Sequence, residues 1–130
     1  MAVLDNGTIL IIDKDEALNA KYTRTLERRG YAVQTAFSLM AAKDYLARAS
    51  PDVIILDVVL PDGNGIDFCG EIYKATNAYI LFISSSEEYQ DKINALDAGG
   101  TVYLNKPCPL DELAVRVKAA MRRRKTSAIP

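Results

Sequence analysis

The feature that most limits the fold of this chain is a regular alternation of five β-rich runs with five amphipathic helical runs over its 130 residues. The expected strands cover residues 8–13, 31–35, 52–57, 79–84 and 101–104, and the first, third and fourth are apolar almost throughout. Strands covered by helices on both faces have this continuous apolar character. Helical segments between successive strands imply right-handed crossovers. We therefore predict an α/β fold, a three-layer, doubly wound (βα)5 parallel sheet with strand order 2-1-3-4-5.

The helical segments carry recognisable start and stop signals. Residues 15–29 end at Gly30, Ser38 is placed to cap a helix over 38–49, and Gly99 with Gly100 stops a helix over 87–98. A turn over 60–65 precedes the third helix, which continues to about residue 74, and Pro109 opens the last helix, over 109–124. We predict one domain over residues 1–125 and a tail or truncated linker over 126–130.

Composition excludes several classes of function. The chain has no histidine, which removes Ser-His-Asp and Cys-His triads, His-ligated metal sites and a phosphohistidine carrier. The net charge of −1 excludes a generally basic nucleic-acid binder. Cys69 and Cys108 have no CxxC spacing and are expected to be packing residues in a reducing compartment. No apolar run is long enough for a membrane span and residues 1–8 lack a basic signal-peptide start, so we expect a cytoplasmic protein with no membrane partner.

Polar side chains mark the carboxyl ends of the expected strands, where ligands bind in sheets of this topology. Asp13 ends the first strand, Asp57 the third and Ser84 the fourth, and Lys106 lies just beyond the fifth. Asp13 and Asp57 should lie side by side on neighbouring strands and repel each other unless a cation lies between them. Mg²⁺ is a hard ion that prefers oxygen ligands, and Lys106 supplies a fixed ammonium. This arrangement suits a phosphoryl group on a carboxylate, with the cation, the ammonium and the Ser84 hydroxyl each contacting one of its oxygens.

Four motifs in this order resemble the receiver domain of two-component response regulators. They are ILIID at 9–13, DVIILDVVLPDGNG at 52–65, FISS at 82–85 and YLNKP at 103–107. The resemblance covers about residues 8–124 and implies the flavodoxin-like, CheY-like form of the predicted fold. It also implies a signalling switch that catalyses its own phosphorylation and dephosphorylation, rather than an enzyme that turns over a small substrate.

The resemblance assigns the chemistry position by position. Asp57 matches the aspartate that accepts a phosphoryl group from a sensor histidine kinase, and Lys106 matches the lysine that pairs with the phosphoryl oxygens. Asp13, Asp57 and the backbone carbonyl of Val59 match the ligands of Mg²⁺. The implied cofactor is therefore Mg²⁺, held by two carboxylates and one carbonyl.

The resemblance also implies how the switch works. Ser84 matches the hydroxyl residue that moves toward the phosphoryl group, and Tyr103 matches the aromatic residue that turns inward behind it. Pro107 matches the proline after the lysine, which in this family is usually in cis linkage. Phosphorylation would shift the population toward an arrangement in which the face of the fourth helix, fifth strand and fifth helix changes.

One position departs from the family pattern. Receivers usually carry two adjacent acids after the first strand, but here Asp13 is followed by Lys14 and then Asp15. Three interpretations are open. Lys14 points into solvent and leaves a weakened Mg²⁺ site, or it lies in the pocket as a built-in cation, with little or no phosphorylation. In the third interpretation Asp15 replaces the missing ligand, although its position suits the N-cap of the first helix.

The last helix resembles that of one subfamily. Residues 112–123 (ELAVRVKAAMRR) are similar to the last receiver helix of the OmpR/PhoB-like subfamily, in which a linker leads to a winged-helix DNA-binding domain. We therefore expect a transcriptional effector that is not in this chain. The basic residues near the end of this helix are expected to be solvated charges favoured by the helix dipole rather than a nucleic-acid site.

The same subfamily forms homodimers through the fourth helix, fifth strand and fifth helix. Lys92 with Glu112, and Asp97 with Lys118, are the expected ion pairs between two copies. The usual acidic pair at the start of the fifth strand is missing, so Arg116 loses a partner. Exposed ion pairs contribute only about 0–1 kcal/mol each, so these charges would tune the register of a dimer more than its affinity.

Two rival hypotheses start from the same residues. The first is an atypical pseudo-receiver, an interaction module with Lys14 in place of a metal-ligand acid and little or no phosphorylation. The second is a small hydrolase of the haloacid-dehalogenase kind, which also uses an aspartate after a strand. That family requires a second aspartate two residues further on, where this chain has Val59, and this chain has no cap domain. The phosphorylated receiver is therefore the leading hypothesis.

Overall fold

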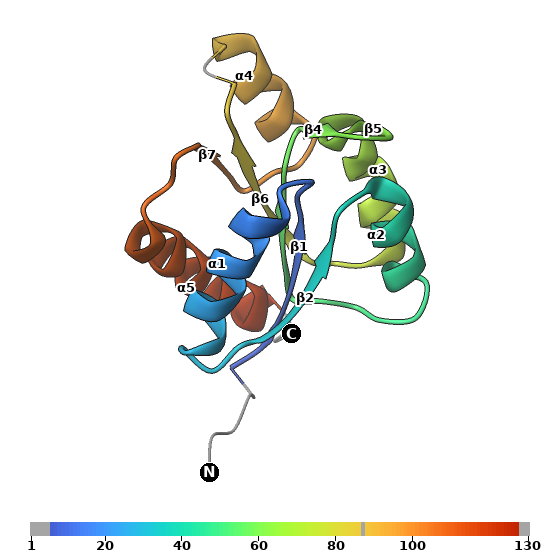
Figure 1. Ribbon diagram of the computed structural model, residues 1–130. Coiled ribbons are helices and arrows are strands. Elements are labelled where there is room, and N and C mark those ends of the chain that lie inside the picture. Colours follow the sequence, from blue (N-terminus) through green and yellow to red (C-terminus); the bar gives the residue numbers. More distant parts are fainter. Residues whose placement is uncertain (1–5, 87, 128–130) are drawn as a thin grey trace.

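The computed structural model describes residues 6–86 and 88–127, with the backbone alone for 125–127. A central sheet lies between helices on both of its faces (Figure 1). The helices are α1 (Glu16–Glu27), α2 (Leu39–Leu46), α3 (Gly65–Ala75), α4 (Tyr89–Asp97) and α5 (Leu110–Ser127). The strands are β1 (Thr8–Ile12), β2 (Ala32–Ala36), β3 (Val53–Leu56), β4 (Val59–Leu60), β5 (Gly63–Asn64), β6 (Tyr79–Ser84) and β7 (Val102–Asn105). The main sheet has the order β2-β1-β3-β6-β7 and is parallel throughout, which confirms the predicted 2-1-3-4-5 topology.

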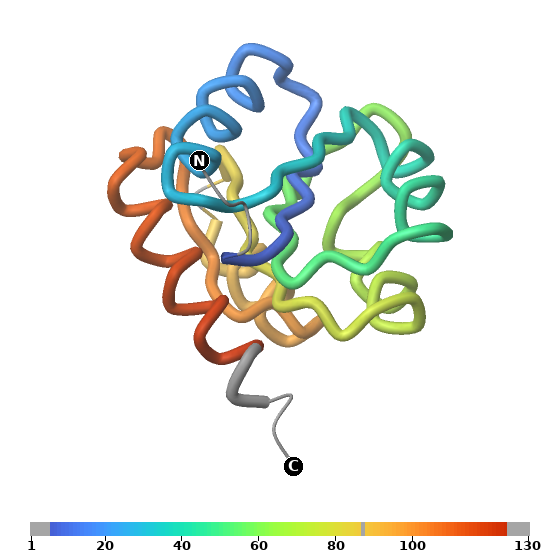
Figure 2. Tube along the Cα trace, turned by 90° about the horizontal axis from the view of Figure 1, so that it is seen from below, coloured from blue at the N-terminus to red at the C-terminus, as the bar shows by residue number. Residues whose placement is uncertain are grey.

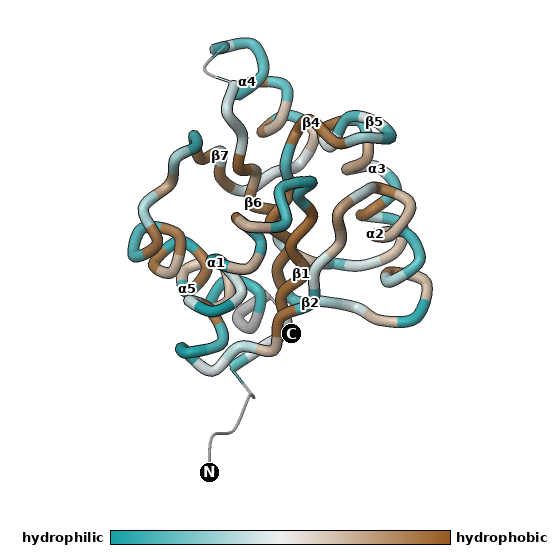
Figure 3. The backbone as a smooth tube through the Cα atoms, viewed as in Figure 1, coloured by the Kyte–Doolittle hydropathy of each residue, from teal (hydrophilic) through white to brown (hydrophobic). Residues whose placement is uncertain are grey.

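Successive residues of each strand face opposite sides of the sheet, so the strands supply two separate cores. Ile9, Ile11 and Ile55 pack in the core beneath α1 and α5, whereas Leu10 and Ile54 pack in the core beneath α2 and α3. The view from below shows α1 and α5 together on one side and the other helices across the sheet (Figure 2). The most hydrophobic backbone runs through the middle of the sheet, as the aliphatic runs predict (Figure 3). The fully buried β3 is central and the half-exposed β2 is an edge strand, both as expected.

Helix caps follow the sequence signals. Asp15 accepts a hydrogen bond from the backbone N–H of Leu18 at 3.0 Å, and Ser38 accepts one from that of Ala41 at 3.1 Å. The helix after Ser38 ends at Leu46 rather than at the predicted residue 49, because the last turn closes through shorter-range bonds such as Arg48 N–H to the Tyr45 carbonyl. The last helix continues to Ser127 rather than ending at residue 124, so residues 126 and 127 belong to α5 and not to the predicted tail. The predicted start of the fourth helix at residue 87 and residues 128–130 of the predicted tail lie outside the described residues.

The predicted turn over 60–65 contains a small antiparallel hairpin formed by β4 and β5. Its tip carries Asp62, whose carboxylate accepts hydrogen bonds from the backbone N–H groups of Leu39 at 2.8 Å and Met40 at 2.9 Å. These bonds lower the pKa of Asp62 and satisfy donors at the start of α2. The hairpin after β3 is therefore tied to a helix more than twenty residues earlier in the chain.

Two predictions about composition also agree with the structure. Cys69 and Cys108 are both buried and unpaired, as expected for packing residues. Among the described residues no helix has the length and apolar character needed to cross a membrane.

Gly65 and Gly70 provide a matched test of how α3 packs beneath the strand ends. A methyl group at Gly65 would overlap the backbone carbonyl oxygen of Asp57, whereas one at Gly70 would meet no atom within 4 Å. We expect Gly65→Ala to lower the free energy of unfolding by about 1–3 kcal/mol. Gly70→Ala should leave it unchanged or raise it by up to about 1 kcal/mol, because alanine favours the helix. Urea unfolding measures both variants, and equal effects would contradict the packing described here.

Candidate functional site

The carboxyl ends of β1, β3, β6 and β7 bring four chemically active side chains to one edge of the sheet. Asp13 follows β1, Asp57 follows β3, Ser84 ends β6 and Lys106 follows β7. Asp13 is 0% exposed, Ser84 1% and Asp57 3%. The backbone N–H of Asp57 donates to the carbonyl of Ile12 at 2.9 Å, which continues the ladder between β1 and β3 to the site. Asp13, Asp57 and Lys106 form one polar cluster, and Ser84 ends β6, the strand that pairs with β3.

The ammonium group of Lys106 bridges the two buried carboxylates. Its Nζ lies 2.8 Å from Oδ2 of Asp13 and 3.0 Å from Oδ2 of Asp57. The backbone N–H of Lys106 donates to the carbonyl of Ser84 at 2.8 Å, and the peptide bond to Pro107 is cis. Two carboxylates and one ammonium leave a formal charge of −1 in this cluster.

Burial and charge act in opposite directions on the cluster. Burial is the largest influence on Asp57 and raises its pKa, and the hydrogen bond and positive charge of Lys106 lower it without reversing the net upward shift. The neighbouring carboxylate of Asp13 raises the pKa of Asp57 further. Burial lowers the pKa of Lys106, but its contacts with Asp13 and Asp57 and their negative charges more than offset this, so its pKa is raised. Lys106 is therefore charged at neutral pH, and ionisation of Asp57 costs more in this cluster than it does in water.

Two contacts that the sequence analysis missed fix Asp13 in place. The backbone N–H of Asp15 donates to Oδ1 of Asp13 at 2.9 Å, and Nδ2 of Asn19 donates to the backbone carbonyl of Asp13 at 2.7 Å. Asn19 is only 1% exposed and lies on the buried side of α1 with Tyr22 and Leu26. Asn19 could have been identified from the sequence as an amide among the buried residues of this helix, because buried polar side chains need a hydrogen-bond partner.

Lys14 lies outside the cluster that it was suspected to complete. Its side chain is exposed, and none of the ion pairs among the described residues includes it. The side chain of Asp15 is engaged at the N-cap of α1 through Leu18. The structure thus favours the interpretation in which Lys14 points into solvent over the two in which Lys14 or Asp15 enters the pocket.

Ser84 and Tyr103 belong to a hydrogen-bonded group beside the cluster. The hydroxyl of Ser84 accepts from the backbone N–H of Ser86 at 3.1 Å. The carbonyl of Ser86 accepts from the hydroxyl of Tyr103 at 3.2 Å and from Nδ2 of Asn105 at 2.7 Å. The ring of Tyr103 is 9% exposed and packs 6.4 Å from that of Phe82. The loop after β6 is therefore held to β7, with Tyr103 turned inward.

The donor atoms at this edge suit a hard divalent cation. The carboxylates of Asp13 and Asp57 and the backbone carbonyl of Val59 are oxygen donors, which Mg²⁺ prefers, and Mg²⁺ keeps several bound waters in protein sites. Oδ2 of Asp13 is buried without a hydrogen bond and has the Lys106 ammonium as its ion-pair partner. The described part of the chain contains no group of three or more His, Cys, Asp or Glu side chains placed to hold a metal. The two carboxylates, with Oδ2 of Asp13 lacking a hydrogen bond, fit Mg²⁺ together with bound water, and the Val59 carbonyl stays a predicted ligand.

The residues predicted for a dimer face are all exposed. Lys92 and Asp97 lie on α4, and Glu112, Arg116 and Lys118 lie on α5. Within the described residues none of them forms an ion pair in its own chain. Their pairing between two copies stays a prediction.

A doubly wound sheet with buried carboxylates, a lysine and a hydroxyl at its carboxyl edge defines a receiver, the phosphoacceptor class of signalling domain. The chain belongs to the response regulator receiver domain family, whose model matches residues 9–118. Receiver domains generally bind Mg²⁺ at the phosphorylation site.

Curated relatives agree with this assignment and with the expected OmpR/PhoB-like subfamily. The chain is 36% identical to the KDP operon transcriptional regulatory protein KdpE of Escherichia coli K12, over 94% of this chain and 54% of that protein. It is 38% identical to the transcriptional regulatory protein KdpE of Mycobacterium tuberculosis, over 92% and 53% of the two chains. It is 34% identical to the response regulator MprA of Mycobacterium avium, over 90% and 52%. The chain thus spans about half the length of the curated relatives it matches.

Solved structures agree with the fold. A two-component response regulator from Clostridium difficile has a TM-score of 0.86 at 35% identity, over 89% of this chain and 96% of that one. A CheY-like receiver domain protein from Methanospirillum hungatei has a TM-score of 0.88 at 21% identity, over 93% and 98%, and supports the fold alone.

Asp57→Asn tests the electrostatic cost of the buried carboxylate. In metal-free buffer at pH 7 we expect the free energy of unfolding of the variant to exceed that of the wild type by about 1 kcal/mol. The reason is that the substitution removes an ionised group from a buried site. The pKa of Asp57 is raised on folding, so the folded state binds its proton more tightly than the unfolded chain does. The wild type therefore gains stability relative to the variant as the pH falls from 7 toward the ordinary carboxyl pKa. The difference in free energy of unfolding between the two proteins then disappears.

Urea unfolding with EDTA over this pH range measures the effect. Asp44→Asn, at an exposed position of α2, is the control and should show no such convergence. A variant at Asp57 that is less stable than the wild type at pH 7 would contradict the expected cost.

Proposed function

We propose that the chain is a phosphorylation-controlled signalling switch in which Asp57 accepts a phosphoryl group from a sensor histidine kinase. The observation that carries this proposal is the contact of Lys106 with both buried carboxylates at the edge of the sheet. A carboxylate oxygen of Asp57 attacks the phosphorus of a phosphohistidine. A P–O bond forms as the P–N bond breaks, and histidine leaves as neutral imidazole when its other ring nitrogen is protonated.

The residues around Asp57 have separate parts in this step. Lys106 already lies 3.0 Å from Asp57, so its ammonium is placed to stabilise charge on a phosphoryl oxygen without moving far. The hydroxyl of Ser84, which accepts a bond from Ser86, can turn to donate to another phosphoryl oxygen. Asp13, Asp57 and the carbonyl of Val59 would hold Mg²⁺, which supplies neutralisation of charge on the transferred group when bound. Water attack on the same acyl phosphate would return the domain to its resting form.

The signalling output depends on the hydrogen bonds that join Ser84, through Ser86, to Tyr103 of β7. Phosphorylation adds roughly −1.5 to −2 charges beside Lys106. Movement of Ser84 toward this charge would break its bond to Ser86, whose carbonyl holds Tyr103 and therefore β7. The face formed by α4, β7 and α5 would change in consequence, favouring a homodimer through that face.

The relatives suggest what the switch controls. KdpE of Escherichia coli carries the name of a transcriptional regulatory protein and is about twice as long as the matched chain. We propose that this receiver controls transcription in the cytoplasm through a winged-helix DNA-binding domain that is not in this chain.

Loss of the phosphoacceptor should abolish phosphate uptake. We expect Asp57→Asn to take up no acid-labile phosphate from acetyl phosphate or from a phosphorylated histidine kinase, because an amide cannot form the acyl phosphate. Labelling with radioactive donor in Mg²⁺ buffer measures it. Asp67→Asn, an exposed position in the first turn of α3, should be labelled like the wild type. Undiminished labelling of Asp57→Asn would overturn the assignment.

Lys14 should weaken the metal site without abolishing it. Lys14→Asp replaces a positive charge by a negative one beside Asp13, and charges a few ångströms apart near a protein surface interact by several kcal/mol. We expect Mg²⁺ affinity to rise at least tenfold, measured by calorimetric or NMR titration. Lys74→Asp makes the same charge change on α3 and should alter the affinity much less. A wild-type chain with no saturable Mg²⁺ site and no phosphate uptake would instead support the pseudo-receiver hypothesis.

A further inference from the structure

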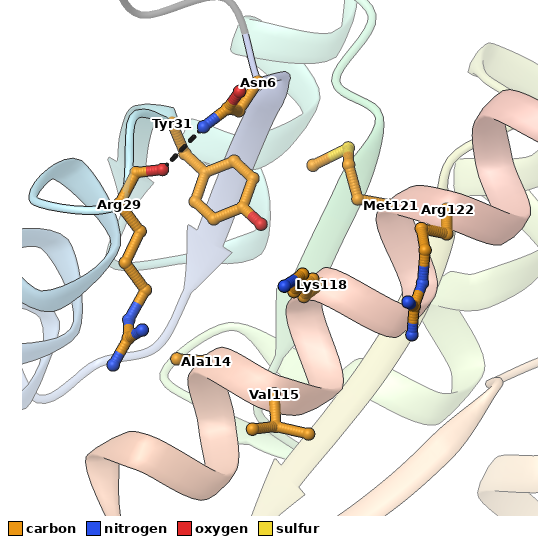
Figure 4. Close-up of a pocket in the computed structure, with 8 residues that line it drawn as sticks. All are labelled: Asn6, Arg29, Tyr31, Ala114, Val115, Lys118, Met121 and Arg122. Carbon is orange, nitrogen blue, oxygen red and sulfur yellow. Dashed lines mark hydrogen bonds between the residues drawn. The ribbon is translucent and has the colours of Figure 1, made fainter.

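A cavity of about 450 Å³ lies between the end of α1 and one flank of α5, on the part of the fold away from the phosphorylation site (Figure 4). Its lining residues are Asn6, Arg29, Tyr31, Ala114, Val115, Lys118, Met121 and Arg122. Cavities of this size accommodate small-molecule ligands. We propose that this cavity binds a small phosphorylated molecule that has a planar or apolar group next to its phosphates.

Three cations surround the cavity without neutralising partners. Arg29, Lys118 and Arg122 line it, and among its described lining residues there is no carboxylate. None of the three forms an ion pair within the described residues. The helix dipole explains basic residues in the last turn of a helix, but its effect falls off within that turn, and Lys118 lies more than two turns before the end of α5. An anion with more than one charge fits this arrangement, because several guanidinium and ammonium groups can donate to phosphate oxygens at once.

The α1 side of the cavity is preformed. The side chain of Asn6 donates to the backbone carbonyl of Arg29 at 2.7 Å, and the backbone N–H of Asn6 donates to the carbonyl of Gly30 at 3.3 Å. Gly30 has a φ of 90°, which lets the chain turn sharply from α1 into β2. Arg29 therefore starts from a fixed backbone and loses less freedom on binding than a residue of a loose loop would.

The remaining wall is suited to a ring or an apolar group. Val115 is 65% exposed, whereas Tyr31 at 5% and Met121 at 4% expose only a small part of their side chains to the same cavity. Burial raises the pKa of Tyr31 and the charge of Arg29 lowers it by less, so the hydroxyl stays protonated and can donate. The structure gives this hydroxyl no hydrogen bond within the described residues, so it is free to donate to a ligand. The combination of a cationic side with an apolar and aromatic side is what distinguishes this cavity from a plain basic surface.

The cavity is separate from the phosphorylation site, and it shares one residue, Lys118, with the predicted dimer face. Arg116, which is predicted for the dimer face, does not line the cavity, whereas Lys118 and Arg122 of the same helix do. The phosphoacceptor Asp57 and its partner Lys106 lie at the carboxyl ends of the strands, and Asn6 precedes the amino end of β1. The inference therefore does not rest on the proposed function.

Titration with two probes of similar charge tests the proposal. ¹⁵N-labelled protein in EDTA buffer is titrated with tripolyphosphate and with ATP, against sodium chloride of matched ionic strength. We expect saturable shifts at residues 29–31 and 114–122 with both probes, and at least threefold tighter binding of ATP because adenine contacts the apolar side. Sodium chloride should not reproduce these shifts.

Neighbouring arginines provide matched controls. Arg29→Gln and Arg122→Gln should each weaken ATP binding about fivefold or more, because each removes a charge-assisted contact. Arg28→Gln and Arg123→Gln change exposed residues one position away that do not line the cavity, and they should weaken it less than twofold. Lys118 is left intact because it is also predicted for the dimer face.

Several results would overturn the proposal. These are shifts that sodium chloride reproduces, equal losses in the control variants, ATP no tighter than tripolyphosphate, or shifts centred on Asp57 instead of the cavity. A failure here would leave the phosphate-uptake experiment on Asp57 unaffected.

Discussion

The contact of one lysine with two buried carboxylates is the interaction on which the site depends. Sheet topology places Asp13 and Asp57 on neighbouring strands, where both are nearly inaccessible to water. Two carboxylates there would repel each other strongly, and Lys106 lies within 3.0 Å of both. Since a single ammonium leaves one negative charge uncompensated, the cluster is prepared for a further cation and for chemistry that changes its charge. In the resting domain burial raises the pKa of Asp57, and the negative charge of Asp13 adds to this rise.

The part of the fold that could be predicted from the sequence is the repeating alternation of strands and helices. Aliphatic runs separated by amphipathic helices predict a parallel sheet covered on both faces, and the order 2-1-3-4-5 suits five such units. The same logic located Asp13, Asp57, Ser84 and Lys106, since each ends or follows a strand. Contacts between distant segments were not predicted. Asp62 contacts α2 from a hairpin within the predicted turn, and Asn19 holds the backbone of Asp13 from the buried side of α1.

The direction of the Lys14 side chain could not be predicted from the sequence pattern alone. Sequence established that a lysine stands where receivers usually have a second acid, and it left three interpretations open. A residue just after a strand can point toward the pocket or away from it, and periodicity does not decide between the two directions. In the structure Asp15 caps α1 and donates its backbone N–H to Asp13, which fixes the loop and leaves Lys14 in solvent. From there its positive charge would still oppose a metal ion beside Asp13, although less strongly than a lysine inside the pocket would.

Helix α5 contributes residues both to the predicted dimer face and to the cavity beside α1. Its buried residues Leu113 and Val117 pack under the sheet, while its exposed residues serve two surfaces. Arg116 and Lys118 are predicted for the face that responds to phosphorylation, and Lys118 with Arg122 lines the cavity beside α1. A ligand that draws Arg29 toward Arg122 would hold α5 against α1, whereas a change at β7 acts on α5 from the other flank. Two inputs that act on one helix are coupled if each favours a different position of it, and such coupling is reciprocal. Occupancy of the cavity would then change how readily phosphorylation alters the α4-β7-α5 face, by the same factor by which phosphorylation changes affinity for the ligand.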